Sequence, residues 1–561
     1  MASFCLLPTE LVEYIVSYLP QHDIYAVCQL NKALSNLAIP FLYRRVDLFI
    51  PAGSKIPRID RFCLAIINST RKANNVKSIR LGLSSSADLR RGQRWLPPDK
   101  NFDDRFMFRK AMTALSNETL VAAGDYLRDA ISMREYSAYA ALILLVLPSL
   151  HCLDIADYKN ATLEHLHSIL RNLDPGTPWN KRYPSRILLT RLSSIKKLSL
   201  VFDRKIGVAY SGDNSRITLD HFLNIPGIQT LELSNQSGNQ HVGTVPALVI
   251  DPMVNSVRAT NITTLVFRHS GALTPTLHSL LRCVPQLRSF TYDFFFRHQP
   301  VAEGSNRNQY MLMLDSWTEV LATFTSTLEV LVFSAEYCDK DAYFFHQPRI
   351  NEKMYGYLDL TAFTALHTLE CPVPFLTGDT KFSITREIYP LFPPALRHVT
   401  LRPDLSHASA PFPFDESRLE RGLTFDESKE EAQWMMNARM DTSYMFQAAL
   451  SLLEYLPELE SIAVWQPADP RLEWFEGQVQ DFATTCTNKN ITGSILKPMV
   501  LRWKNAVHWD LMKETRVFDR EMPQFGTVNR FWREEWKGRP LGLGCQYHLD
   551  ALGSRKIRMR R

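Results

Sequence analysis

The sequence has neither a long hydrophobic segment nor a cysteine pattern, and each shortage excludes a class of protein. Its longest apolar run, Ala138 to Leu147, is half of the roughly 20 residues that cross a bilayer, which predicts a buried helix and no membrane insertion. No basic residue precedes Pro8, so we expect no secretion signal and a cytoplasmic or nuclear location. Nine cysteines lie scattered without a C-x-x-C pair, which argues against a disulfide framework and a zinc site.

Motifs of known catalytic and nucleotide-binding sites are also missing. The sequence contains no G-x-S-x-G, Walker loop or H-E-x-x-H. Gly542-Leu543-Gly544 lacks a third glycine, and His165 and His167 are two residues apart, which points them in different directions on a helix. His508 and Asp510 stand beside tryptophans without a nucleophile. We therefore expect a non-catalytic protein, with no catalytic residues, no metal and no cofactor; a hydrolase or transferase in the C-terminal region is an alternative.

The charge of the chain is close to balanced. Its 561 residues include 64 basic and 58 acidic residues, a net charge of +6 that is spread through the sequence. Nucleic-acid binding requires a concentrated basic surface, so we expect no nucleic-acid partner. The one dense basic segment is the tail at 551–561, with five basic residues between Arg555 and Arg561. A nuclear-import or anionic-surface patch and a solvated chain end both fit this tail.

Residues 7 to 45 are predicted to form three short helices with more apolar surface than they can bury among themselves. Pro8 suits the first helical position, and Asp23 is a plausible N-cap of the second helix. Leu11, Ile15 and Leu19 recur at helical spacing on the first. Fewer than 45 residues without metal or disulfide rarely fold alone, so this surface must contact the rest of the chain or another protein.

The identity of the residues favours contact with another protein over contact with the rest of the chain. The pattern from Leu7-Pro8 to Asn31-Lys32 resembles an F-box, and Phe41 to Arg45 continue it as in many fungal members. Leu34 departs from the family, which often has tryptophan at this position. The resemblance implies docking onto the Skp adaptor and, through it, the cullin of an SCF-type ubiquitin ligase. The adaptor-binding residues that it implies are Leu7, Pro8, Leu11, Ile15, Leu19, Asp23, Ile24 and Leu30.

The body of the chain repeats a short apolar pattern. The pattern spans six residues, of which the first, fourth and sixth are apolar. It recurs ten times, often after a turn with proline. The apolar triads are Val76-Ile79-Leu81, Leu150-Leu153-Ile155, Ile195-Leu198-Leu200, Ile228-Leu231-Leu233, Ile262-Leu265-Phe267, Leu287-Phe290-Tyr292, Leu328-Leu331-Phe333, Leu366-Leu369-Cys371, Leu396-Val399-Leu401 and Leu459-Ile462-Val464. Each triad predicts a short buried strand.

Helical stripes lie between several of these strands. They are Leu163 to Leu170, Leu277 to Val284, Trp317 to Phe324 and Ala449 to Leu456. The order of helix, turn and strand predicts an irregular βα solenoid of the α/β class and resembles a leucine-rich-repeat array. The asparagine typical of that family is missing, and Gln236 takes its place in the best unit. A purely helical solenoid is the alternative.

In a βα solenoid, the residue between the second and third apolar positions faces the open concave surface. We call these ten residues the central row and take them as candidates for substrate binding. Seven are polar or charged, three of them acidic and one basic, so the row offers no arginine cluster for a phosphorylated peptide. They are Arg80, Asp154, Ser199, Glu232, Val266, Thr291, Val332, Glu370, Thr400 and Ala463.

The predicted organisation is an F-box at 1–48, the leucine-rich-repeat-like array at 60–470, an aromatic-rich C-terminal cap at 471–550 and the basic tail. Insertions interrupt the array at Ser84 to Asp104, Phe294 to Asn308 and Arg402 to Gln433; acidic tetrads in the last, including Phe425 to Ser428, are expected in a solvated loop. We expect a substrate-recognition subunit of a ubiquitin ligase that binds an unknown protein substrate through its repeats. A scaffold that binds the adaptor outside a ligase is the alternative.

Overall fold

The computed structural model divides the chain into two compact units. Unit 1 comprises Met1–Lys205, Ser211–Gln236 and Leu248–Ile262, and unit 2 comprises Ile206–Tyr210, Ser237–Ala247 and Thr263–Arg561. The residues that the structure describes are 7–50, 56–82, 96, 106, 109–110, 113, 125–156, 163, 165–166, 192–203, 216–218, 220–223, 225–236, 247–249, 261–270, 274–297, 312–338, 354–379, 387–408, 425–467, 470–503 and 506–533. Both units combine helices with long runs of mostly parallel strands, so the chain is α/β as predicted.

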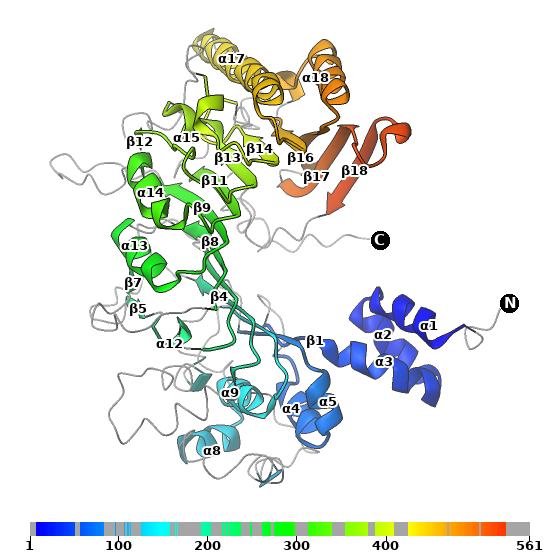
Figure 1. Cartoon of the computed structure of the whole chain (residues 1–561). Helices are drawn as coiled ribbons and strands as arrows, with labels where there is room; N and C mark the ends of the chain where they lie inside the picture. The colour runs from blue at the N-terminus through cyan, green and yellow to red at the C-terminus, as the bar shows by residue number, and fades with distance from the viewer. Residues whose placement is uncertain are drawn as a thin grey trace. The chain divides into compact units, whose positions relative to one another are not determined.

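Unit 1 begins with the three predicted helices, shown in blue in Figure 1: α1 (Thr9–Ser17), α2 (Gln21–Leu30) and α3 (Lys32–Arg44). Pro8 is the N-cap of α1, one residue before the first helical position that was expected for it. The expectation for Asp23 is wrong, because α2 starts two residues earlier and Asp23 lies in its first turn, where its charge favours the helix dipole. Asn31 caps α3 by accepting a hydrogen bond from the Leu34 amide at 2.9 Å.

The rest of unit 1 is a run of parallel strands in the order β1 (Arg45–Asp47), β2 (Ser78–Gly82), β3 (Cys152–Ala156), β4 (Lys197–Asp203) and β6 (Thr230–Gln236). The helices between them are α4 (Ile59–Ile67), α5 (Thr70–Asn75), α8 (Asp125–Ser132), α9 (Tyr136–Val146) and α12 (Asp220–Leu223). Short strands β5 (Arg216–Thr218) and β7 (Ala247–Val249) lie outside this run. Helix α9 confirms the buried helix predicted from the longest apolar run, since Tyr136 to Leu145 are all buried.

Unit 2 continues the same alternation. Its parallel strands are β8 (Thr264–Ser270), β9 (Ser289–Arg297), β11 (Val330–Cys338), β13 (Thr368–Pro372), β14 (His398–Arg402), β15 (Ser461–Trp465) and β16 (Thr492–Trp503). The antiparallel strands β17 (Ala506–Phe518) and β18 (Val528–Arg533) complete the order. The connecting elements are α13 (Thr274–Cys283), β10 (Leu312–Met313), α14 (Leu314–Leu321), η7 (Ala322–Phe324), β12 (Met354–Tyr355), α15 (Val373–Thr377), η9 (Tyr389–Leu391), α17 (Phe425–Tyr455), η10 (Pro470–Leu472), α18 (Glu476–Lys489) and η11 (Pro523–Phe525).

All ten predicted triads coincide with strands. Every one of their apolar residues is buried, and the second and third positions of each triad align in register with those of the neighbouring strand. The predicted helical stripes also hold at α13, α14 and α17, while the stripe at Leu163 to Leu170 lies mostly outside the described residues. The alternative of a purely helical solenoid is wrong, because strands form the buried layer of both units.

Among the described strands of the two parallel runs, two carry no predicted triad. Strand β1 follows α3 without a linker and pairs with β2, so the N-terminal helices run directly into the sheet. Strand β16 pairs in parallel with β15, which extends the strand and helix alternation past residue 470 through α18. Gly493 occupies the place where the pattern requires an apolar residue, opposite Ile462. A Cβ at Gly493 would lie 2.6 Å from Cys486 Sγ of α18, so the close approach of this helix excludes a larger side chain.

We expect Gly493→Ala to destabilise unit 2 by about 1–3 kcal/mol, because the added methyl overpacks the contact with Cys486 and Val517. Gly477→Ala is the control, since a Cβ at this position of α18 meets nothing within 4 Å. Alanine is the better helix former, and the control should stabilise the unit by about 0.5–1 kcal/mol. Urea denaturation followed by tryptophan fluorescence measures both, and a Gly493→Ala midpoint at or above that of the parent would contradict the packing.

The last predicted insertion needs a correction. The tetrad Phe425 to Ser428 forms the first turn of α17 and not a solvated loop, while the tetrad at Phe414 to Ser417 lies outside the described residues. Helix α17 is 31 residues long and buries the stripe that includes Ala449 and Leu452. No helix in the described part of the chain is long and apolar enough to cross a membrane.

Candidate interaction surfaces

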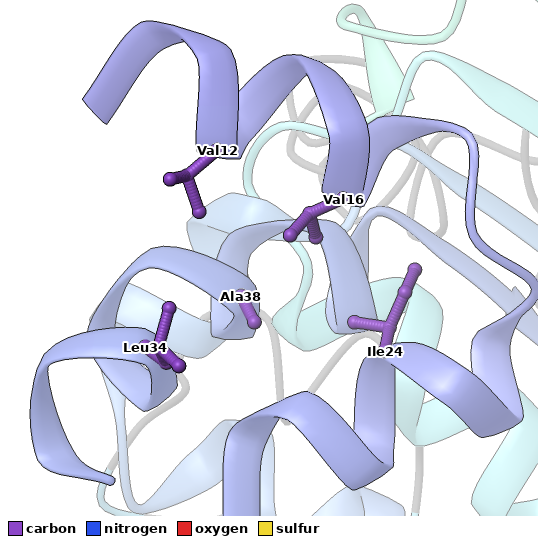
Figure 2. Packing of buried hydrophobic residues seen from close by; sticks show 5 residues of the cluster. All are labelled: Val12, Val16, Ile24, Leu34 and Ala38. Carbon is purple, nitrogen blue, oxygen red and sulfur yellow. The ribbon is translucent and has the colours of Figure 1, made fainter. Parts of the chain in front are cut away.

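Helices α1 to α3 form a small core of their own. Val12 and Val16 of α1, Ile24 of α2, and Leu34 and Ala38 of α3 are buried and point toward one another (Figure 2). Val12 and Val16 face this core, whereas Leu11 and Ile15, one position before them and so about 100° around the helix, are exposed. One helical stripe of α1 therefore stabilises the module, and the adjacent stripe is left uncovered.

The uncovered stripe of α1 is apolar, and α2 has exposed apolar side chains of its own. We use the name α1–α2 face for the exposed large hydrophobic residues of these two helices and their flanks; with their exposed fractions they are Leu7 (40%), Leu11 (50%), Tyr14 (63%), Ile15 (39%), Tyr18 (72%), Tyr25 (56%) and Leu30 (68%). The Tyr14 and Tyr18 rings meet edge to face at 5.0 Å, and the Tyr18 hydroxyl donates to that of Tyr14 at 3.1 Å. Exposed apolar surface on this scale is typical of a binding site.

Four of the eight predicted adaptor residues belong to this face, and three others are at least half-buried. Leu7, Pro8, Leu11, Ile15 and Leu30 are exposed; Leu19 and Asp23 are half-buried; Ile24 is buried in the core and is unavailable to a partner. Sequence reasoning omitted the three tyrosines from the candidates. The period of α1 already carried the signal, because Tyr14 and Tyr18 follow Leu7 and Leu11 on the same side of the helix.

The module is joined to the sheet of unit 1 by side-chain contacts as well as by the chain. The Gln21 side-chain amide donates to the carbonyl oxygens of Leu42 and Arg45 at 3.2 and 3.1 Å. The Tyr43 ring stacks on the Phe62 ring of α4 at 6.2 Å, and the Lys72 ammonium lies 5.5 Å from the centroid of the Tyr43 ring. These contacts fix the end of α3 against α4 and α5.

In unit 1 the central row forms a line of neighbours. Arg80, Asp154, Ser199 and Glu232 align across β2, β3, β4 and β6, and Asp47 of β1 extends the line. Arg80 stacks 4.1 Å above the Phe49 ring and lies 3.4 Å from the Asp154 carboxylate. Lys197 pairs with Glu232 at 2.8 Å. The charges on this part of the row are thus largely neutralised by contacts within the chain.

In unit 2 the remaining residues of the central row also align. Val266, Thr291, Val332, Glu370, Thr400 and Ala463 are neighbours across β8 to β15. Val266 is buried and the others are half-buried. Glu370 is held by the Arg402 guanidinium at 2.5 Å, so its carboxylate is engaged. This part of the row offers hydroxyl groups and small apolar side chains and little net charge.

Some of the fragments considered for catalysis lie in the described residues and others do not. His165 lies 2.9 Å from the Glu135 carboxylate, while His167 and Gly542-Leu543-Gly544 lie outside the described residues. His508 and Asp510 belong to strand β17. Within the described ranges, no three His, Cys, Asp or Glu side chains are placed to hold a metal ion.

Comparison with known proteins adds no relative. No protein-family model matches the chain, and no curated protein has a similar sequence. The exposed α1–α2 face and the two aligned parts of the central row are therefore the features from which function is argued.

Proposed function

We propose that the protein is a substrate-recognition subunit of an SCF-type ubiquitin ligase. In this proposal the α1–α2 face docks on the Skp adaptor and through it on cullin. The observation that carries the proposal is the division of α1 into two stripes, with Val12 and Val16 in the core and Leu11 and Ile15 exposed. A module that resembles an F-box, and that leaves an apolar face uncovered, is suited to bind a partner through that face.

The repeat body then holds the protein to be modified. Its central row lies on neighbouring parallel strands, whose fixed spacing presents side chains at regular intervals. A receptor subunit contributes proximity, because tethering raises the local concentration of substrate lysines at the charged conjugating enzyme. Such a role requires no nucleophile of its own.

The test is a pulldown with purified Skp adaptor and cullin. We expect the Leu11→Asp/Ile15→Asp double variant to lose at least tenfold in adaptor affinity, because two charges would be buried unpaired in the interface. The fold should survive, since both side chains are exposed. The matched control is Met436→Asp/Met440→Asp, which places two aspartates at the same spacing on exposed positions of α17.

The outcomes separate the proposals. Recovery of both adaptor and cullin by the parent and by the control, with loss of both by the α1 variant, supports the receptor. Recovery of adaptor without cullin supports the alternative scaffold. Failure of the folded parent to bind the adaptor contradicts both. Circular dichroism of each variant keeps loss of binding distinct from loss of folding.

A further inference from the structure

A row of basic side chains crosses the start of the strands in unit 1. The Lys77 amide donates to the Arg44 carbonyl at 3.1 Å, the His151 amide to Lys77 at 2.8 Å, and the Lys196 amide to His151 at 2.8 Å. The four residues therefore hold equivalent positions directly before or at the start of β1, β2, β3 and β4. We call Arg44, Lys77, His151 and Lys196 the basic row.

The cations of this row have no acidic partner among the described residues. Arg44 and Lys196 are exposed, and Lys77 and His151 are half-buried. Burial lowers the pKa of His151, and the charges of Lys77 and Lys196 lower it further. His151 lies between the two lysines along the row, and its lowered pKa leaves it neutral at physiological pH. The row thus combines three positive charges with an imidazole.

The equivalent positions in unit 2 are arranged differently. There, Arg288 pairs with Glu329 of the next strand at 2.9 Å, and Arg397 pairs with Glu460 of the next strand at 3.7 Å. Alternation of basic and acidic residues neutralises that edge within the chain. The basic row of unit 1 lacks this alternation, so its charge is available to an outside partner.

We propose that the basic row binds an acidic, extended peptide segment of another protein. Adjacent strands lie about 4.8 Å apart, so the four side chains span about 14 Å. An extended peptide of four or five residues covers this length, and its carboxylates would meet Arg44, Lys77 and Lys196 in turn. This binding does not depend on the adaptor contact, because it uses neither α1 nor α2.

A peptide fits this surface better than nucleic acid or a membrane. Single-stranded nucleic acids require exposed aromatic rings for stacking, and membrane surfaces require apolar side chains for insertion. Apart from the residues of the α1–α2 face, the exposed large hydrophobic residues in the described part of unit 1 are Phe106 and Met133. Tyr43, which neighbours Arg44, is already covered by Phe62 and Lys72.

The test is fluorescence anisotropy of the full-length chain with a labelled glutamate-rich peptide and a glutamine counterpart of equal length. We expect the glutamate peptide to bind at least tenfold more tightly than the glutamine peptide. The Lys77→Glu/Lys196→Glu variant should lose at least tenfold in this affinity. The matched control is Arg288→Glu/Arg397→Glu, which changes the net charge equally at the equivalent edge of unit 2 and should lose less than twofold.

Three results would overturn the proposal: no preference for glutamate, equal losses in the variant and its control, or tighter binding of a labelled single-stranded DNA or of phosphatidylserine vesicles. Lys77→Gln/Lys196→Gln gives a milder change of the same sign if the reversed charges impair folding. Adaptor binding should be the same in every one of these variants, so failure here is distinguishable from failure of the receptor proposal.

Discussion

Replacing Trp317 with alanine is expected to destabilise unit 2 by about 3–5 kcal/mol, more than a hundredfold in its folding equilibrium. The indole is 3% exposed and comes from α14. Its ring lies 4.7 Å from Tyr292, 5.0 Å from Phe294 and 5.7 Å from Phe333. Removal of the indole would leave a cavity between α14 and strands β9 and β11, and a rigid aromatic cluster cannot close it.

Urea denaturation followed by near-ultraviolet circular dichroism measures this effect. Trp317→Phe should restore part of the loss because a ring still fills most of the volume. Phe525→Ala is the control, since this aromatic side chain is 65% exposed and should shift the midpoint little. Equal midpoints for Trp317→Ala and the control would show that the cluster does not stabilise the unit.

The strands of this fold could be predicted because each one is encoded by a pattern of a few consecutive residues. Each triad, such as Leu328-Leu331-Phe333, alternates inward and outward positions over a few residues, and its apolar positions are all buried. Where a helix such as α13 or α14 lies between successive strands, the crossover makes those strands parallel. Strand β16 was not predicted because its local pattern is incomplete. Gly493 stands at an inward position where the pattern requires an apolar residue, and Cys486 of α18 fills the space.

The division of α1 into two stripes could not be predicted. Leu11 and Val12 are both apolar and adjacent, so periodicity alone does not say which of them faces α2 and α3. The choice depends on the packing of Val12 and Val16 against Leu34 and Ala38, which are far along the chain. Ile24 was placed in the interface on family resemblance, whereas the three-helix packing buries it.

The basic row could not be predicted either, because it also depends on contacts between residues far apart in the sequence. Arg44, Lys77, His151 and Lys196 are far apart in the sequence, and each is unremarkable beside its own triad. Only the register of β1 to β4 brings them together. The residues of the central row align on neighbouring strands, but Val266, which the pattern places on an open surface, is buried. No local pattern indicates that Arg402 engages Glu370.

Arg402 links two carboxylates in the interior of unit 2. Its guanidinium, 3% exposed, lies 2.5 Å from Glu370 and 2.8 Å from Asp404, and stacks 5.0 Å from the Trp465 ring. Asp404 also accepts a hydrogen bond from the Ala335 amide at 2.9 Å. Burial raises the pKa of Asp404 above its ordinary value, and Arg402 opposes this shift. Arg402 therefore stabilises the charged form of the buried Asp404 carboxylate.

We expect Arg402→Met to destabilise unit 2 by about 3–5 kcal/mol near neutral pH, because it leaves Asp404 buried without its counter-charge. Without Arg402 the pKa of Asp404 rises further above its unfolded value. A carboxyl group with a raised folded pKa takes up its proton more readily in the folded state, so acidification favours folding. The difference in unfolding free energy between parent and variant should therefore shrink from about pH 8 to about pH 5.

Chemical denaturation of parent and variant at the two pH values checks both the size and the direction of the effect. Arg288→Met is the matched control, since its partner Glu329 is 38% exposed and a surface pair contributes at most about 1 kcal/mol. A loss for Arg402→Met as small as that of the control would mean that water or neighbouring groups already compensate Asp404. A loss that stayed constant with pH would mean that the lost packing on Trp465, rather than the uncompensated carboxylate, destabilises the variant.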